Sequence, residues 1–240
     1  MKRWLLCVSL PVCLSFIELG YTSRPIALLE GEKKEKGHYF DEVKLIKERQ
    51  QELRTAFKQS HNQDSVIRAA SRYIHYQVSR NLYDYWYGTP WEFYGTTDTP
   101  QVGSIACGYF VTTLLRDVGV KLNRKALAET YSEKMITTLV QRKWIRKYTP
   151  FNLEAFVNDL KQKGDALYIV GLDLHTGFIS VENGEVWFIH STVLSPGCVI
   201  KEKAAESVAL IYNKYTVCGC LTCDHAFITR WLNGSQPVME

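Results

Sequence analysis

The segment from Asp165 to Thr192 constrains the fold more than any other part of the chain. Two runs of alternating apolar and polar residues meet there at Asn183-Gly184. Asn-Gly between such runs is a strong short-range signal for a β-hairpin with a two-residue turn. This register pairs Gly177 with His190. We therefore expect an antiparallel sheet that contains this hairpin.

The hairpin also brings two histidines together. His175 lies two residues before Gly177, so its side chain points to the same sheet face as that of His190. Diagonal positions on neighbouring strands lie about 7 to 8 Å apart, a distance that two imidazole side chains can span. Glu182 and Glu185 face each other unfavourably in this register, and a slip of one residue would put the histidines on opposite faces.

A second feature is the abrupt change from loop to helix between Ser104 and Val120. Its apolar positions follow the spacing of one helix face: Phe110, Val111, Leu114, Leu115 and Val118. Gly119 suits the C-terminal cap of this helix. Cys107 therefore lies at the helix start, beside Gly108.

Cys107 is in a position that favours a nucleophile. The unpaired N–H groups and the dipole of a helix start stabilise a thiolate, so we expect the pKa of this thiol to be lowered. The same N–H groups could hold the oxyanion of a tetrahedral intermediate. A thiolate also needs a base that a third group orients, and His175 and His190 offer both. A buried, inert thiol is the alternative, because free cysteine is common in protein cores.

Two helices are expected before this region. The first spans Phe40 to Gln59, and the second opens at Asp64 as its N-cap and runs through Val78. The segment from Tyr83 to Gly103 then breaks the helical period with Gly, Pro and Thr. Such an aromatic loop often walls a binding cleft, although aromatic residues that fill the core explain part of it.

The stretches ACGYFVTTLLRDVGV and HTGFISVENGEVWFIHST together resemble the NlpC-type cell-wall peptidases, which are compact papain-like cysteine hydrolases. The resemblance covers roughly Tyr83 to Thr192. It implies an α+β, papain-like fold in which N-terminal helices and the nucleophile helix pack on an antiparallel β-sheet. It also implies that Cys107 is the nucleophile, His175 the general base and His190 the residue that orients this base.

The chain departs from the family pattern around the nucleophile. Ala106-Cys107-Gly108 stands where the family typically has Asp-Cys-Ser-Gly, and the hairpin between the two histidines is longer than usual. The resemblance therefore implies a divergent member. Substrate choice is the property that this divergence affects most.

The resemblance suggests further site residues. Papain-like enzymes carry an oxyanion-stabilising Gln shortly before the nucleophile, a position that Gln101 matches unless it is a solvent-exposed loop residue. Many NlpC-type members use an upstream Tyr, for which Tyr94 is available. Trp91 would wall the substrate cleft beside Tyr94, and so would Trp86. Asp173 shares the sheet face of the expected base and is an alternative orienting residue.

Composition sets broader limits. The chain has 240 residues, of which 46% are hydrophobic and 22% charged, so it can build a core and shows no compositional sign of disorder. The net charge of +4 comes from Lys and Arg interleaved with acidic residues, which argues against a nucleic-acid partner. We expect one domain over residues 40–235.

Residues 1–22 have the layout of a secretory signal peptide, in which two basic residues precede an apolar run from Trp4 to Ile17. An N-terminal helix packed on the core, or a lipid anchor at Cys13, are the alternatives. The run is shorter than the about 20 apolar residues of a membrane span, so none is expected in the mature chain. Residues 23–39 are expected to form a linker, and the mature protein to be periplasmic or secreted.

Cysteine usage fits export. The cysteines beyond the signal region are Cys107, Cys198, Cys218, Cys220 and Cys223. This odd number leaves at least one thiol free. The CGCLTC cluster resembles a zinc motif, but zinc sites usually need a second, distant ligand pair, so disulfides or inert thiols are favoured over a metal.

The expected activity is hydrolysis of an amide bond by acyl transfer through Cys107 to water, with no metal or organic cofactor. The resemblance implies the stem peptides of bacterial peptidoglycan as the substrate. A non-catalytic wall-binding or scaffold protein of the same shape is one alternative. A hydrolase or acyltransferase of this fold that acts on protein or lipid acyl groups is another.

Overall fold

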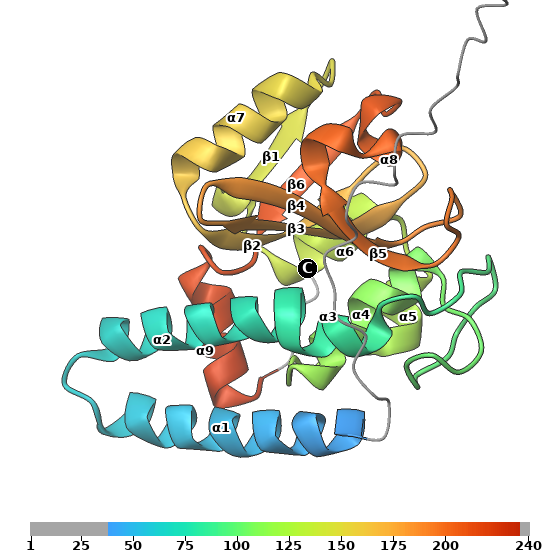
Figure 1. Cartoon of the computed structure of the whole chain (residues 1–240). Helices are drawn as coiled ribbons and strands as arrows, with labels where there is room; N and C mark the ends of the chain where they lie inside the picture. Colours follow the sequence, from blue (N-terminus) through green and yellow to red (C-terminus); the bar gives the residue numbers. More distant parts are fainter. Residues whose placement is uncertain (1–37, 236–240) are drawn as a thin grey trace, which may run out of the picture.

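The computed structural model describes residues 38–235, which form a six-stranded sheet with helices on both faces (Figure 1). The α-helices are α1 (Tyr39–Gln59), α2 (Gln63–Tyr76), α3 (Leu82–Trp86), α4 (Cys107–Asp117), α5 (Arg124–Ala128), α6 (Ser132–Leu139), α7 (Leu153–Lys163), α8 (Val208–Ile211) and α9 (His225–Asn233). The strands are β1 (Ile145–Tyr148), β2 (Ala166–Gly171), β3 (Thr176–Glu182), β4 (Glu185–Ser191), β5 (Val199–Lys203) and β6 (Thr216–Cys220).

The sheet has the strand order β1-β6-β2-β3-β4-β5, and all neighbouring strands run antiparallel. The α+β class and the antiparallel sheet expected from the sequence are therefore confirmed. Every residue of β2 and β3 is buried. This burial follows from the two helical layers, which leave neither face of the central strands to solvent.

Each face of the sheet has its own hydrophobic core. Leu167, Ile169 and Phe178 point to the layer of α1, α2, α4, α6 and α9. Tyr168 and Ile179 point to the opposite face, where Phe156 of α7 covers them. In Figure 1 the first layer lies below the sheet and α7 lies above it.

The β3–β4 hairpin has the register that the sequence predicts, with Glu182 opposite Glu185 and Phe178 opposite Ile189. Asn183 and Gly184 at the turn have φ of 52° and 78°. Positive φ at both central residues is the requirement of a type I′ turn, which Asn-Gly meets at little cost. Asn183 also donates its backbone N–H to Asp165 Oδ1 at 2.8 Å, which anchors the turn.

The N-terminal helices differ from expectation at their starts. α1 begins at Tyr39, one residue early and inside the expected linker, because the buried Tyr39 hydroxyl donates to Asp117 of α4 at 2.6 Å. The N-cap of α2 is Asn62 rather than Asp64, since Asn62 has the non-helical backbone and accepts from the Ser65 N–H. The Asp64 carboxylate falls in the first turn, where the helix dipole favours it.

The aromatic segment divides into two parts. A π-helical turn, Gln77–Asn81, carries the helical chain on into α3, and Tyr83 and Trp86 are fully buried core residues. Trp86 therefore does not wall a cleft, because its ring packs in the core. Residues 87–106, here named the cleft loop, run on the surface to the start of α4. The interpretation of the aromatic residues as core residues is therefore confirmed for Tyr83 and Trp86.

α4 starts at Cys107, and Gly119 after its end has φ of 99°, as a helix-terminating glycine requires. Gly108 has a different role. A Cβ at this position would lie 2.4 Å from the carbonyl oxygen of Ala128 at the end of α5. Only glycine lets α5 approach the first turn of α4 so closely.

Cys220 and Cys223 form a disulfide, while Cys107, Cys198 and Cys218 are free thiols. The expected signal peptide, and residues 23–37 of the expected linker, lie outside the described residues. Over residues 38–235, the structure contains no helix with the length and apolar character that crossing a membrane requires.

Candidate active site

Cys107 opens α4 and is a half-buried residue with a free thiol. The N-cap residue, Ala106, has no side chain to satisfy the first-turn amides of the helix. Cys107 and His175 both line a cavity of about 880 Å³, here named the Cys107 cleft. They also line a smaller cavity of about 200 Å³, here named the side pocket. Nucleophile and base candidates therefore lie where two cavities adjoin.

His175 lies one residue before β3 and His190 lies in β4, and the two rings are in direct contact. His175 Nε2 and His190 Nδ1 are 2.7 Å apart. His190 stacks on Phe188, with ring centroids 3.9 Å apart. The predicted register therefore gives the predicted contact between the two rings on one face of the sheet.

The contact continues to a third residue, Glu202 of β5. His190 Nε2 lies 3.1 Å from Glu202 Oε1. Burial raises the pKa of this carboxyl, but the hydrogen bond from His190 and the Ser207 hydroxyl together outweigh burial and keep the pKa below its ordinary value. Glu202 is therefore an anion at neutral pH and can only accept a hydrogen bond.

The ionised carboxylate assigns the tautomers of both rings. Burial lowers the pKa of His190, so this ring is neutral and carries one N–H. It donates its Nε2–H to Glu202, and its Nδ1 accepts from the Nε2–H of His175. A neutral His175 then carries its lone pair on Nδ1. This nitrogen is the one left to take a proton from a nucleophile.

Burial keeps both the Cys107 thiol and the His175 imidazole neutral at neutral pH. Burial raises the pKa of the Cys107 thiol, although the backbone N–H groups of Thr176, Gly108 and Cys107 itself act in the opposite direction. Burial also lowers the pKa of His175, to about 3. The lowered thiol pKa expected from the helix start is thus wrong, because desolvation outweighs the helix amides here.

Among the described residues, the structure has no hydrogen bond between the Cys107 thiol and the His175 ring. The thiol instead lies against the backbone N–H of Thr176, the residue after His175. Catalytic hydrogen bonds often tighten only when substrate is bound. The arrangement is a neutral thiol and a neutral imidazole that line the same cleft.

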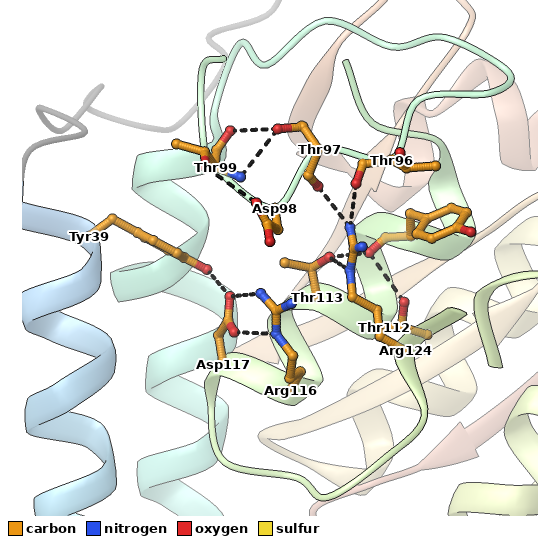
Figure 2. Close-up of polar contacts among 11 residues, drawn as sticks. Tyr39, Thr96, Thr97, Asp98, Thr99, Thr112, Thr113, Arg116, Asp117 and Arg124 are labelled. Atoms are coloured by element: carbon orange, nitrogen blue, oxygen red, sulfur yellow. Dashed lines mark hydrogen bonds and ion pairs between the residues drawn. The ribbon is translucent and has the colours of Figure 1, made fainter. Parts of the chain in front are cut away.

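The cleft loop is fixed by Arg124 of α5, as Figure 2 shows. Its guanidinium donates to the carbonyl oxygens of Thr96 and Thr97, at 3.0 and 2.7 Å, and to Thr113 Oγ1 of α4 at 2.7 Å. One side chain thereby connects the loop to the helix that carries Cys107. The wall of the cleft is held in place relative to the nucleophile candidate.

Other predicted site residues divide into two groups. Trp91 and Tyr94 line the Cys107 cleft with Cys107 and His175. Gln101 instead donates its side-chain N–H to the Tyr85 carbonyl at 3.0 Å and has φ of 59°, which makes it a structural residue of the loop. An oxyanion formed at Cys107 would therefore meet the helix-start amides rather than the Gln101 side chain.

Asp173, the alternative partner of His175, makes other contacts. Its Oδ2 accepts from the Lys214 N–H at 2.9 Å, and its backbone N–H donates to Asn213 Oδ1. These bonds fix the turn between β2 and β3. Geometry therefore favours His190 over Asp173 as the residue that orients His175.

Glu202 was not singled out from the sequence. The alternation of Val199–Lys203 could have suggested a strand, but its pairing with β4 follows a loop of seven residues, 192–198, whose path the sequence does not specify. Comparison of the chain with protein-family models, with curated proteins and with solved structures finds no match in any of the three. The function is therefore argued from the site itself.

Proposed function

We propose that the protein is a cysteine hydrolase that cleaves an amide bond, with a papain-like, NlpC-type arrangement of Cys107, His175 and His190. The observation that carries the proposal is the directed chain of two imidazoles and a carboxylate. His175 is held by a 2.7 Å contact to His190, and both Cys107 and His175 line the same cleft. An oriented base beside a nucleophile is the general signature of covalent catalysis.

The first step transfers the Cys107 proton to His175 Nδ1 as the sulfur attacks the carbonyl carbon. A C–S bond forms, and the carbonyl oxygen becomes an anion that faces the backbone N–H groups of Cys107 and Gly108. The C–N bond then breaks, and the leaving amine takes the proton from His175. Water then gives a proton to the same nitrogen as its oxygen attacks the thioester carbonyl. The C–S bond breaks, the sulfur takes the proton back from His175, and the acid leaves.

The environment favours a concerted first step. The thiol and the imidazole are both neutral before substrate binds. The proton therefore moves from Cys107 to His175 only once substrate has excluded water from the cleft, as the sulfur attacks. When the His175 imidazolium forms, its Nε2–H remains bonded to His190, whose other N–H faces Glu202. The carboxylate can thus stabilise the positive charge through the intervening ring.

The N-terminal sequence pattern supports export, so we place this activity in the periplasm or outside the cell. Peptide stems of peptidoglycan are the amide substrate that the family resemblance suggests. The direct test is hydrolysis of an amide substrate by the wild type, Cys107→Ala and Cys107→Ser. We expect turnover in the wild type alone. Equal turnover in Cys107→Ala would refute the proposal.

A further inference from the structure

The Cys107 cleft has an unusual lining for a site open to water. Fourteen large apolar side chains are exposed among residues 38–235, and seven of them line this one cavity. They are Phe93, Tyr94, Leu174, Val193, Leu194, Val208 and Tyr212. Apolar side chains that gather in one hollow, rather than scatter singly, mark a binding site for an apolar partner.

These residues come from separate parts of the chain. Phe93 and Tyr94 belong to the cleft loop, Leu174 precedes His175, Val193 follows β4, and Tyr212 follows α8. Leu174 is 97% exposed although it is the immediate neighbour of the candidate base. Exposure of this extent has no structural benefit for the isolated chain, because the side chain packs on almost nothing.

The charged residues of the lining also favour a neutral, apolar ligand. Glu129 and Asp173 line the cleft, whereas no Lys or Arg of the described residues does. Peptides that carry free carboxylates would meet these acids without a cation to receive them. A neutral, apolar group meets no such penalty.

The cavity has room for a chain of this kind. Its volume of about 880 Å³ is within the range of about 300 to 1,000 Å³ that small-molecule sites occupy. The side pocket beside Cys107 is less than a third of this size, and its lining includes both polar and apolar residues, among them Thr130, Ser132 and Met135. Cys107 and His175 line both cavities, so a scissile bond there would place the larger group in the apolar Cys107 cleft and the smaller group in the side pocket.

We propose that the substrate of the hydrolase carries a long aliphatic chain on one side of the scissile carbonyl, and that this chain occupies the Cys107 cleft. This inference rests on the proposed amide hydrolase and narrows its substrate class to an apolar acyl or alkyl amide, in place of the stem peptide that the family resemblance suggests. The adjoining nucleophile is the reason to assign the cleft to a substrate rather than to a protein partner.

The test uses the full chain and a series of acyl p-nitroanilides from acetyl to decanoyl. We expect kcat/KM to rise about three- to fourfold for each methylene that enters the cleft, the value of its burial. Val193→Asp should flatten this dependence, lowering the decanoyl-to-acetyl ratio of kcat/KM at least tenfold. Leu45→Asp, a matched control at a similarly exposed apolar position on α1, should leave the ratio unchanged.

The outcomes separate the two proposals. Hydrolysis of the acetyl compound that is lost in Cys107→Ala, without any gain for longer chains, overturns the aliphatic substrate and leaves the hydrolase in place. Faster hydrolysis of a stem-peptide amide with free carboxylates leads to the same conclusion.

If no anilide is hydrolysed, the aliphatic-chain proposal is tested by ligand binding instead. N-decylacetamide binding to Cys107→Ala is then followed by calorimetry and by tryptophan fluorescence, to which Trp91 in the cleft lining contributes. Saturable binding that Val193→Asp weakens, and Leu45→Asp does not, supports the aliphatic site. Absence of binding at millimolar concentration overturns it.

Discussion

The ring of His175 lies 2.7 Å from the ring of His190, and Glu202 holds the far side of the second ring at 3.1 Å. The three side chains come from the start of β3, from β4 and from β5, which are neighbours in the sheet. A carboxylate at one end gives the chain a direction, so that its other end is a free lone pair on His175 Nδ1. The sheet therefore acts as the rigid support that sets the orientation of the base.

The pH dependence of Cys107 alkylation tests the neutral resting pair. Burial raises the pKa of the thiol, so the thiolate fraction should still increase about tenfold per pH unit through neutrality. We expect the rate of iodoacetamide labelling at Cys107, followed by peptide mass spectrometry, to rise without a plateau up to about pH 8.5. A constant rate from pH 5 upwards would instead indicate a thiolate–imidazolium pair.

His175→Gln should abolish amide hydrolysis and also change the response of stability to acid. The pKa of His175 is about 3 in the folded chain and about 6.5 when unfolded. Between these values only the unfolded state binds the proton, so the native state loses free energy of unfolding as pH falls. Between pH 7 and pH 4.5, the Tm of the wild type should therefore fall further than the Tm of His175→Gln. Parallel Tm curves would contradict the buried, neutral imidazole.

Replacement of His190 by Asn should preserve more activity than replacement by Ala. An Asn side chain can accept the Nε2–H of His175, whereas Ala leaves this donor without its partner. We expect His190→Ala to lower kcat by at least an order of magnitude, and His190→Asn to retain much of it, with similar KM values. Thermal melting of both variants serves as the control, because His190 is buried against Phe188. Full activity in His190→Ala would remove it from the site.

Glu202 is a positioning residue, and the loss of its negative charge should change how kcat depends on pH. Without the anion, the His175 imidazolium loses a stabilising charge and forms less readily. Glu202→Gln should therefore lower kcat about tenfold or less and move the acidic limb of the kcat profile to lower pH. Glu206→Gln, an exposed acid nearby in sequence, is the matched control. An unchanged limb in Glu202→Gln would show that the residue has only a structural role.

Arg124→Ala should loosen the wall of the cleft. The variant loses the bonds to the Thr96 and Thr97 carbonyls, which connect the cleft loop to α4 and α5. We expect KM to rise about three- to tenfold with a smaller change in kcat, since the nucleophile and base keep their own contacts. Lys125→Ala, an exposed cation one residue further along α5, should alter neither value. Equal effects of the two variants would argue against this role.

The sequence by itself determined those features of the fold that depend on residues close together in the chain. Asn183-Gly184 specified the turn of the hairpin, and the turn specified the register that makes His175 and His190 neighbours, because a two-residue loop admits only one pairing. The change of period at Cys107 likewise located the start of α4. The Asn62 cap and the continuation into α3 were missed, because local signals there compete and packing selects between them.

Tertiary structure decided what depends on distant segments. Glu202 reaches His190 only because β5 pairs with β4, and the apolar lining of the Cys107 cleft is assembled from loops far apart in sequence. The pKa of the Cys107 thiol likewise depends on segments that are distant in sequence. A helix start favours the thiolate, but the degree of burial, which the whole fold sets, reverses the direction of the shift. Local backbone preferences are encoded within a few residues, whereas desolvation depends on everything packed around a group.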